Sequence, residues 1–250
     1  MLDEICALAR ECGILIKQAH AGNIQIKSEN PKNLVTEYDT KVQEILRQKL
    51  LKILPEAGFL GEEGQKNFNR NGYCFICDPI DGTTNFVKNL KHSGVSIALL
   101  HDGKPVLGVI YNPYLDELFW AEKGKGAYCN GRQIHTSAEP LQNSLIVFGT
   151  SPYNADLQAK TWQLAAKSLE VALDVRRQGA AVLDLTDVAC GRFGMFWELE
   201  LQPWDFAAGA LIVEEAGGII RTLENESVTD YFAPTSLAAM ANISAEILFK

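Results

Sequence analysis

The sequence predicts an α+β fold with mixed β-sheets, and three features of its pattern support this. Two amphipathic segments with helical spacing come first, short β-prone segments separated by turn residues fill the middle, and strands alternate with helices in the last third. With 250 residues the chain can bury a sizeable core. We expect one domain, residues 1–250, made of two lobes at about 1–140 and 141–250, with the softest boundary at Gly131–Asn143.

The first half is expected to begin with two helices. Apolar residues recur at helical spacing from Leu2 to about Ala21, and the polar segment Lys27–Asn33 is predicted to be an exposed loop. The second helix follows Leu34–Asp39 and ends at Pro55. Strands are then expected at Gly58–Gly61 and Tyr73–Ile76, and in a meander at Ser93–Leu100, Val106–Tyr111, Glu117–Ala121 and Gly126–Tyr128.

The second half is expected to alternate between strands and helices. The predicted strands are Leu145–Phe148, Leu173–Arg176, Phe193–Glu198, Ile219–Ile220 and Leu237–Met240. The predicted helices are Asp156–Leu169, Gly179–Cys190, a segment from Pro203 to the stop at Gly217-Gly218, and a closing turn at Ala245–Phe249.

The composition narrows the function. A net charge of −8 and a pI near 5.1 argue against broad contact with nucleic acid or anionic membranes. No apolar run reaches the ~18 residues that span a bilayer, and the start of the chain has no leader pattern, so we expect a cytoplasmic protein. The Cys74-x-x-Cys77 pair lacks a second metal-binding pair, and on a strand its side chains would face opposite ways.

The stretch Asp78–Phe86 carries the strongest chemical signal. It follows the strand at Tyr73–Ile76, so Asp78 and Asp81 stand at the carboxyl end of that strand. Two carboxylates three residues apart can hold a hard divalent cation. The following Gly82-Thr83-Thr84 turn can open a short helix whose free N–H groups bind phosphate. This combination is typical of a phosphate-ester site.

Carboxylates at the edges of other predicted elements can join this pair. Such a cluster repels itself unless cations offset the charge, and oxygen ligands without His or Cys favour Mg²⁺ or Mn²⁺ over zinc. Two cations about 3.5–4 Å apart activate water and stabilise the leaving alkoxide in phosphate-monoester hydrolysis. Helix capping remains an alternative role for the two candidates in first helical turns. The candidates are Asp39, Glu62, Asp78, Asp81 and Asp205.

Motifs for other kinds of phosphate site are missing from the sequence. No Gly-x-x-x-x-Gly-Lys-Ser/Thr pattern occurs, which argues against a Walker-type nucleotide site. Gly-x-Gly occurs only at Gly124–Gly126, inside the meander and not before a helix, so dinucleotide binding has little support.

Four segments, in their order and spacing, resemble one known family. They are Leu34-Val35-Thr36-x-x-Asp39, Gly61-Glu62-Glu63, Asp78–Phe86, and Pro203-Trp204-Asp205 with Glu215-Ala216-Gly217-Gly218. Together they look like the inositol monophosphatase family, and the resemblance covers nearly the whole chain. It implies a layered αβαβα sandwich (the sugar phosphatase fold), two or three Mg²⁺ ions per active site with Mn²⁺ as a substitute, inhibition by lithium, and a homodimer.

The resemblance also implies roles for individual residues. Glu62, Asp78 and the Ile80 carbonyl would hold the first cation, and Asp78, Asp81 and Asp205 the second, with a weaker third near Glu62. Thr83, hydrogen-bonded to Asp39, would orient the attacking water, and the N–H groups of Gly82 and Thr83 would hold the phosphate. The positions that would face the polyol ring are Gly179, Ala180, Ala181, Glu198 and Asp205.

Two departures from the family pattern stand out. A loop lysine that family members place before the Leu-Val-Thr segment falls on Ser28 here, with Lys27 and Lys32 nearby, which affects the third cation. Glu200 replaces a residue that is often small, so it either disfavours a second phosphate on the substrate or points to solvent.

The expected activity is Mg²⁺-dependent hydrolysis of inositol monophosphate or a similar small polyol or sugar phosphate. The alternatives within the same chemistry are fructose 1,6-bisphosphatase and phosphatases for 3′-phosphoadenosine, histidinol phosphate or dinucleotides. The sequence Thr84-Asn85-Phe86 favours the inositol type. A non-catalytic scaffold with the same fold is the alternative from another class.

Overall fold

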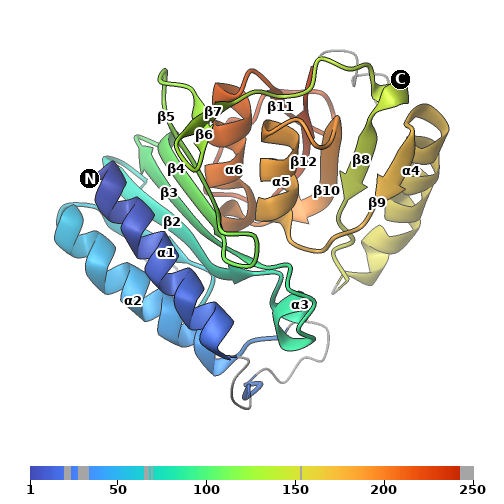
Figure 1. Cartoon of the computed structure of the whole chain (residues 1–250). Helices are drawn as coiled ribbons and strands as arrows, with labels where there is room; N and C mark the ends of the chain where they lie inside the picture. The colour runs from blue at the N-terminus through green and yellow to red at the C-terminus, as the bar shows by residue number, and fades with distance from the viewer. Residues whose placement is uncertain (20–23, 28–33, 65–67, 69, 153, 243–250) are drawn as a thin grey trace.

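The computed structural model describes residues 1–19, 24–27, 34–64, 68, 70–152 and 154–242. Its elements form successive layers of helix, sheet, helix, sheet and helix (Figure 1). The helices are α1 (Leu2–Ala19) and α2 (Glu37–Ile53) in the first layer, α5 (Ala181–Ala189) and α6 (Pro203–Glu215) in the central one, and α4 (Gln158–Val171) in the last. The mixed sheets that the sequence predicted and the layered αβαβα arrangement that the family resemblance implied are confirmed.

The first sheet has seven strands in chain order, and only its first pair is parallel. The expected meander is therefore confirmed, with one strand more than predicted, because Asn130 and Gly131 adopt positive φ angles of 49° and 78° and form a two-residue hairpin turn. The strands are β1 (Gly58–Gly61), β2 (Tyr73–Asp81), β3 (Gly94–His101), β4 (Lys104–Asn112), β5 (Glu117–Glu122), β6 (Ala127–Cys129) and β7 (Arg132–Ile134).

The second sheet has five strands in the order β11-β12-β10-β8-β9, with both parallel and antiparallel pairs. They are β8 (Leu145–Phe148), β9 (Asp174–Arg176), β10 (Met195–Leu201), β11 (Ile219–Thr222) and β12 (Thr235–Met240). Short helical segments complete the described chain: α3 (Thr83–Val87) and 3₁₀ turns at Leu141–Asn143 and Ala155–Leu157. The last of these turns shifts the start of α4 from the expected Asp156 to Gln158.

Apolar side chains that alternate along the strands hold the layers together. On β2, Cys74 and Ile76 belong to a buried cluster shared with α5 and α6, whereas Phe75 and Cys77 belong to one shared with α1 and α2. Because neighbouring side chains of a strand point to opposite faces, the two cysteines lie on opposite faces of the sheet, as expected.

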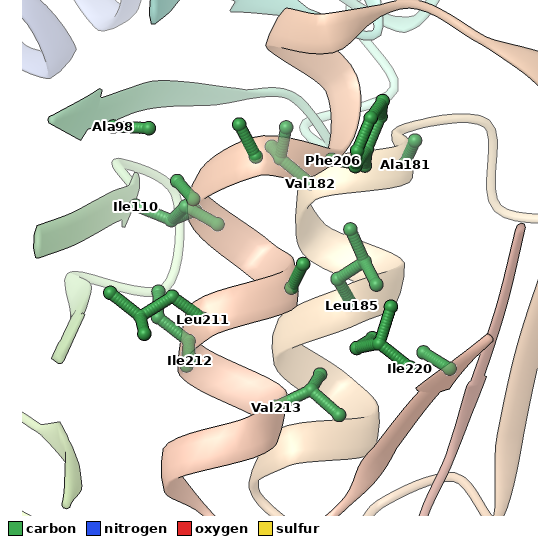
Figure 2. Packing of buried hydrophobic residues seen from close by; sticks show 14 of the residues in the cluster. Ala98, Ile110, Ala181, Val182, Leu185, Phe206, Leu211, Ile212, Val213 and Ile220 are labelled. Atoms are coloured by element: carbon green, nitrogen blue, oxygen red, sulfur yellow. The ribbon is translucent and has the colours of Figure 1, made fainter. Parts of the chain in front are cut away.

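Helix α6 lies between the first sheet and α5. Figure 2 shows Leu211 of α6 on the side of Ile110, which belongs to β4, and Leu185 on the neighbouring helix α5. Gly108 of β4 permits this close approach, since a Cβ atom there would be 2.7 Å from the backbone oxygen of Ala208. The buried cluster around α6 draws residues from both sides of residue 140. The division into lobes at that point stays a prediction.

Three expectations need comment. The strand that was expected to end at Ile76 continues to Asp81, and a register shift between Asp78 and Asp81 accommodates Pro79, which cannot donate to the ladder. The closing turn at Ala245–Phe249 and most of the Lys27–Asn33 loop lie outside the described residues. Among the described helices, none is long and apolar enough to cross a bilayer.

Candidate active site

The corner between β2 and α3 is the local structure on which the site is built. Gly82 is the N-cap of α3 with φ of 79°, a conformation that side chains rarely adopt. A Cβ atom there would also lie 3.1 Å from the backbone oxygens of Gly179 and His92. Glycine is therefore required at this corner, and the loop that contains Gly179 packs directly against it.

A cavity of about 600 Å³ opens beside this corner. It brings together residues from β2, α3, the start of α6 and the loop before α5. In Asp78, Asp81 and Asp205 one carboxylate oxygen each lies within 4.8 Å of the others. The predicted site residues that line the cavity are Glu62, Asp78, Ile80, Asp81, Gly82, Thr83, Gly179, Ala181, Glu198 and Asp205.

Each aspartate of the cluster is fixed by a backbone N–H group. The Ile80 N–H donates to Asp78 Oδ1 at 2.9 Å, and the Val182 N–H donates to Asp81 Oδ2 at 2.8 Å. The Gln202 N–H donates to Asp205 Oδ2 at 2.7 Å, which is a helix-capping bond. Capping and membership of the acidic cluster are thus combined in Asp205.

Asp39 is also both a cap and a neighbour of the site. Its Oδ2 accepts hydrogen bonds from the N–H and hydroxyl of Thr36, which form a capping box at the start of α2. Its Oδ1 lies 3.3 Å from Thr83 Oγ1, and this hydroxyl is also 3.0 Å from the Ile80 backbone oxygen. Asp39 does not line the cavity itself and reaches it through Thr83.

Burial raises the pKa of the cavity carboxylates. The pKa of Glu62 rises to about 8, first because of burial and then because of the charges on Glu63 and Asp39. The pKa of Asp81 rises to about 7 because of burial, although the Val182 N–H opposes the shift. Burial also raises the pKa of Asp78 and Asp205 well above their usual range, and neighbouring carboxylates add to it. These acids repel one another when ionised.

The donor set fits a hard divalent cation. It consists of carboxylate oxygens and the Ile80 carbonyl, the oxygen ligands that Mg²⁺ prefers. Within the described part of the chain, no lysine or arginine forms an ion pair with the clustered acids. Three aspartate oxygens gathered within 4.8 Å, with no ion pair to a basic side chain among the described residues, match what a bound cation needs.

Most of the residues expected to face a polyol ring line the same cavity. Glu198 Oε1 accepts from the Ser151 N–H at 3.2 Å, and burial raises the Glu198 pKa to about 7. A Cβ atom at Gly149 would lie 1.8 Å from Glu198 Oε2, so only glycine leaves room for this carboxylate. Ala180 does not line the cavity, and its side chain packs against Gly82 instead.

The sequence analysis did not identify Asn85 and Arg177, whose hydrogen-bond partners at the site are distant from them along the chain. Asn85, noted only as a family marker, is buried and donates to the backbone oxygens of His92, Gln178 and Gly179 at 2.8, 2.9 and 3.2 Å. Arg177 lines the cavity and donates to Thr150 Oγ1. A buried amide after a helix start is a weak signal in the sequence, and nothing there identifies its partners.

Of the two departures from the family pattern, the structure describes Glu200 fully and the loop lysine region only at Lys27. Glu200 has a positive φ of 59°, its Oε2 accepts from Asn154 Nδ2 at 2.7 Å, and it is absent from the described cavity lining. It therefore points neither into the cavity nor freely to solvent. Lys27 is exposed, while Ser28 and Lys32 lie outside the described residues.

The layered fold and the acidic cavity beside the Gly82 corner define the class of this protein, which is that of a phosphatase. A sequence profile of the inositol monophosphatase family matches residues 1–248. The chain belongs to the inositol monophosphatase family.

Individual relatives agree with this assignment. An inositol-1-monophosphatase of Rhizobium meliloti (strain 1021) is 39% identical over 214 residues, which cover 85% of this chain and 78% of that protein. The Nus factor SuhB of Escherichia coli (strain K12) is 36% identical over 225 residues, covering 88% of this chain and 84% of that protein.

Solved structures give the same result. The extragenic suppressor protein suhB from Bartonella henselae has a TM-score of 0.92 at 36% identity, with 99% of this chain and 96% of that chain covered. An IMPase/NADP phosphatase complexed with Mg²⁺ and phosphate has a TM-score of 0.85 at 26% identity, with 98% and 92% covered.

Proposed function

We propose that this chain is a Mg²⁺-dependent phosphomonoesterase that hydrolyses inositol monophosphate, or a similar small polyol or sugar phosphate, to the free alcohol and inorganic phosphate. The observation that carries the proposal is the convergence of Asp78, Asp81 and Asp205 within 4.8 Å beside the Gly82 corner. The related phosphatase complexed with Mg²⁺ and phosphate supports the choice of cation.

The cations would be held by the buried acids. We assign Glu62, Asp78 and the Ile80 carbonyl to a first Mg²⁺, and Asp78, Asp81 and Asp205 to a second, with a weaker third near Glu62. Mn²⁺ has the same preference for oxygen ligands and is expected to substitute. When bound, the cations supply an activated water molecule and stabilise the departing alkoxide.

Thr83 and Asp39 would orient the attacking water. The Thr83 hydroxyl has a single proton and two acceptors in reach, the Asp39 carboxylate and the Ile80 backbone oxygen. If the Ile80 oxygen holds a cation, the proton of Thr83 would point to Asp39. The lone pairs of Thr83 would then accept a hydrogen bond from the water and so orient its oxygen toward the phosphorus.

The substrate would be held at both of its ends. The N–H group of Thr83, the first residue of α3, has no partner within that helix and is available to the phosphate. We assign the N–H group of the N-cap residue Gly82 to the phosphate as well, although it bonds to the Asp81 carboxylate in this structure. We assign Gly179, Ala181, Glu198 and Asp205 to the polyol ring. Ala180, which the family pattern also suggests, would act by supporting Gly82.

The test is phosphate release from inositol 1-phosphate with and without Mg²⁺. Asp81→Asn keeps the shape of the side chain but removes its charge, and we expect kcat/KM to fall at least about a hundredfold because a cation ligand is lost. Asp3→Asn is the matched control, since this carboxylate is exposed in the first turn of α1. Equal phosphate release by wild type and Asp81→Asn would refute catalysis at this site.

A non-catalytic scaffold is the second candidate, favoured by the similarity to proteins named Nus factor SuhB. All the predicted cation ligands are present in this chain, which favours the enzyme. The same assay separates the two, because a scaffold releases no phosphate above the Asp81→Asn background.

The physiological substrate is a further part of the proposal. A kinetic panel of inositol 1-phosphate, fructose 1,6-bisphosphate, 3′-phosphoadenosine 5′-phosphate and NADP⁺ ranks the alternatives by kcat/KM. Inhibition by lithium and a homodimeric state, which the family resemblance implies, are checked by the same assay with Li⁺ and by sedimentation.

A further inference from the structure

Glu200 lies at an irregularity of β10, where this strand passes the cavity. Between Glu198 and Leu201 the strand advances three residues, while its partner β12 advances two, from Leu237 to Thr235. The extra residue is a β-bulge, and Glu200 occupies it with a φ of 59°, in the left-handed region that favours glycine. A glutamate there is strained, and such strain persists where the surrounding structure compensates for it.

The bulge decides which side chains of β10 face the cavity. Glu198 lines the cavity, and regular alternation along the strand would place Glu200 on the same face. Leu201 lines the cavity instead and belongs to the buried cluster around α5 and α6, whereas Glu200 is absent from the described lining. The bulge therefore keeps a further carboxylate out of a cavity that already contains Glu198 and Asp205.

The carboxylate of Glu200 is bonded to a side chain whose orientation is fixed. Glu200 Oε2 accepts from Asn154 Nδ2 at 2.7 Å. The amide of Asn154 cannot be turned over, because its Oδ1 accepts from the backbone N–H of Asp156 at 3.2 Å and an N–H group only donates. This one bond joins the bulge of β10 to the 3₁₀ turn that leads into α4.

The same connection reaches the wall of the cavity. The backbone N–H of Asn154 donates to the Ser151 backbone oxygen at 3.0 Å and closes a turn that contains Pro152. Pro152 and Gln158, which lie on either side of Asn154 in the chain, both line the cavity. The N–H of Ser151 also holds the carboxylate that is expected to face the ring. Loss of the bond between Asn154 and Glu200 would therefore loosen this part of the wall.

We propose that Glu200 is a positioning residue, and that its bond to Asn154 holds this wall in a shape that favours ring-shaped polyol phosphates over smaller acyclic ones. A preorganised wall improves the binding only of a substrate that is large enough to reach it. The phosphate and the cations are assigned to other residues, so the effect falls on the alcohol part of the substrate. This inference rests on the proposed phosphatase function and specifies how its substrate is selected.

The test compares inositol 1-phosphate with glycerol 2-phosphate, a monophosphate of a smaller, acyclic alcohol. For the wild type we expect a higher kcat/KM with inositol 1-phosphate. Glu200→Gly removes the carboxylate and accepts the left-handed backbone, and the ratio of the two kcat/KM values should fall about fivefold, mainly through KM. Its Tm should stay within about 2 °C of the wild-type value, because the relieved backbone offsets the lost bond.

An exchange of donor and acceptor tests the bond itself. Glu200→Gln keeps an oxygen that can accept from Asn154 and should retain the wild-type ratio. Asn154→Asp places two carboxylates against each other and should lower the ratio further than Glu200→Gly does. The double variant of Asn154→Asp and Glu200→Gln again pairs a donor with an acceptor, so it should recover most of the ratio.

Asn225→Gly is the matched control for the backbone effect. Asn225 is an exposed residue with a φ of 63°, and it lies between β11 and β12 in a turn closed by a bond from its N–H to the Thr222 backbone oxygen. We expect this variant to keep the wild-type ratio. Because each ratio is measured within one protein, partial unfolding of a variant cancels.

The outcomes separate the two proposals. An unchanged ratio in Glu200→Gly or Asn154→Asp, or a double variant without recovery, overturns the positioning role and leaves the phosphatase intact. A wild type without a preference for inositol 1-phosphate, or an equal loss in Asn225→Gly, also overturns it. A wild type that releases phosphate from neither probe overturns the phosphatase, and the inference falls with it.

Discussion

Replacing Asn85 by alanine is expected to destabilise the fold and loosen the ring side of the site together. The Asn85 side chain is only 4% exposed, and its Nδ2 serves three backbone oxygens, those of His92, Gln178 and Gly179. It thus connects α3, which begins at the phosphate corner, to the loop that would face the polyol ring.

The magnitude follows from the bonds that are lost. An amide has two N–H groups, so the three contacts amount to two full hydrogen bonds, one of them shared. Each buried carbonyl left without a donor costs about 1–3 kcal/mol. Since water can enter part of the space that the shorter side chain leaves, we expect Asn85→Ala to lower the free energy of unfolding by about 3 kcal/mol.

Urea denaturation measures this loss, and the KM for inositol 1-phosphate measures the effect on the site. We expect KM to rise while the Mg²⁺ concentration for half-maximal activity stays the same, because the proposed cation ligands are fixed by other N–H groups. Asn85→Asp keeps the shape but lacks both donors, and should destabilise at least as much. Asn143→Ala, an exposed control, should change stability by less than about 0.5 kcal/mol. Wild-type stability in Asn85→Asp would refute the reasoning.

Two further predictions concern the cavity itself. In Gly149→Ala the new methyl group displaces the Glu198 carboxylate and breaks its hydrogen bond to Ser151. The KM for inositol 1-phosphate should therefore rise about fivefold, while the Mg²⁺ requirement stays unchanged. An unchanged KM would show that Glu198 does not contact the substrate. The metal-free protein should lose stability as pH rises from about 4 to about 8, because the raised pKa of Glu62 lets the folded state bind more protons than the unfolded state in this window. Chemical denaturation in EDTA and in Mg²⁺ checks this, since Mg²⁺ should remove most of the slope; equal slopes would contradict it.

The parts of the fold and site that the sequence predicted are those with a local signal. A buried apolar run before Asp78, a Gly-Thr corner after it and helix starts at Asp39 and Asp205 can each be recognised within about ten residues. The Asn130-Gly131 turn is also a local signal, and its positive φ angles explain the unpredicted strand β7.

The parts that could not be predicted depend on contacts between distant residues. Val182 and Asp81 are 101 residues apart, Asn85 and Gly179 are 94 apart, and Arg177 and Thr150 are 27 apart. Each contact exists because two loops meet when the layers stack, and neither loop has a periodicity that specifies its partner. Only the packed structure places a guanidinium at an acidic cavity.

The backbone bonds of the acids explain how like charges can be assembled before any cation binds. In Asp39, Asp78, Asp81 and Asp205, one carboxylate oxygen accepts a hydrogen bond from a backbone N–H. Such bonds stabilise the ionised form and fix the rotamer. In Asp78, Asp81 and Asp205 the second oxygen is left to turn toward the cavity, whereas the second oxygen of Asp39 contacts the Thr83 hydroxyl. Helix capping and cation binding therefore do not compete in Asp205, because the cap uses one oxygen and orients the other. An acid at a helix start or strand end can thus serve the fold and the site with the same conformation.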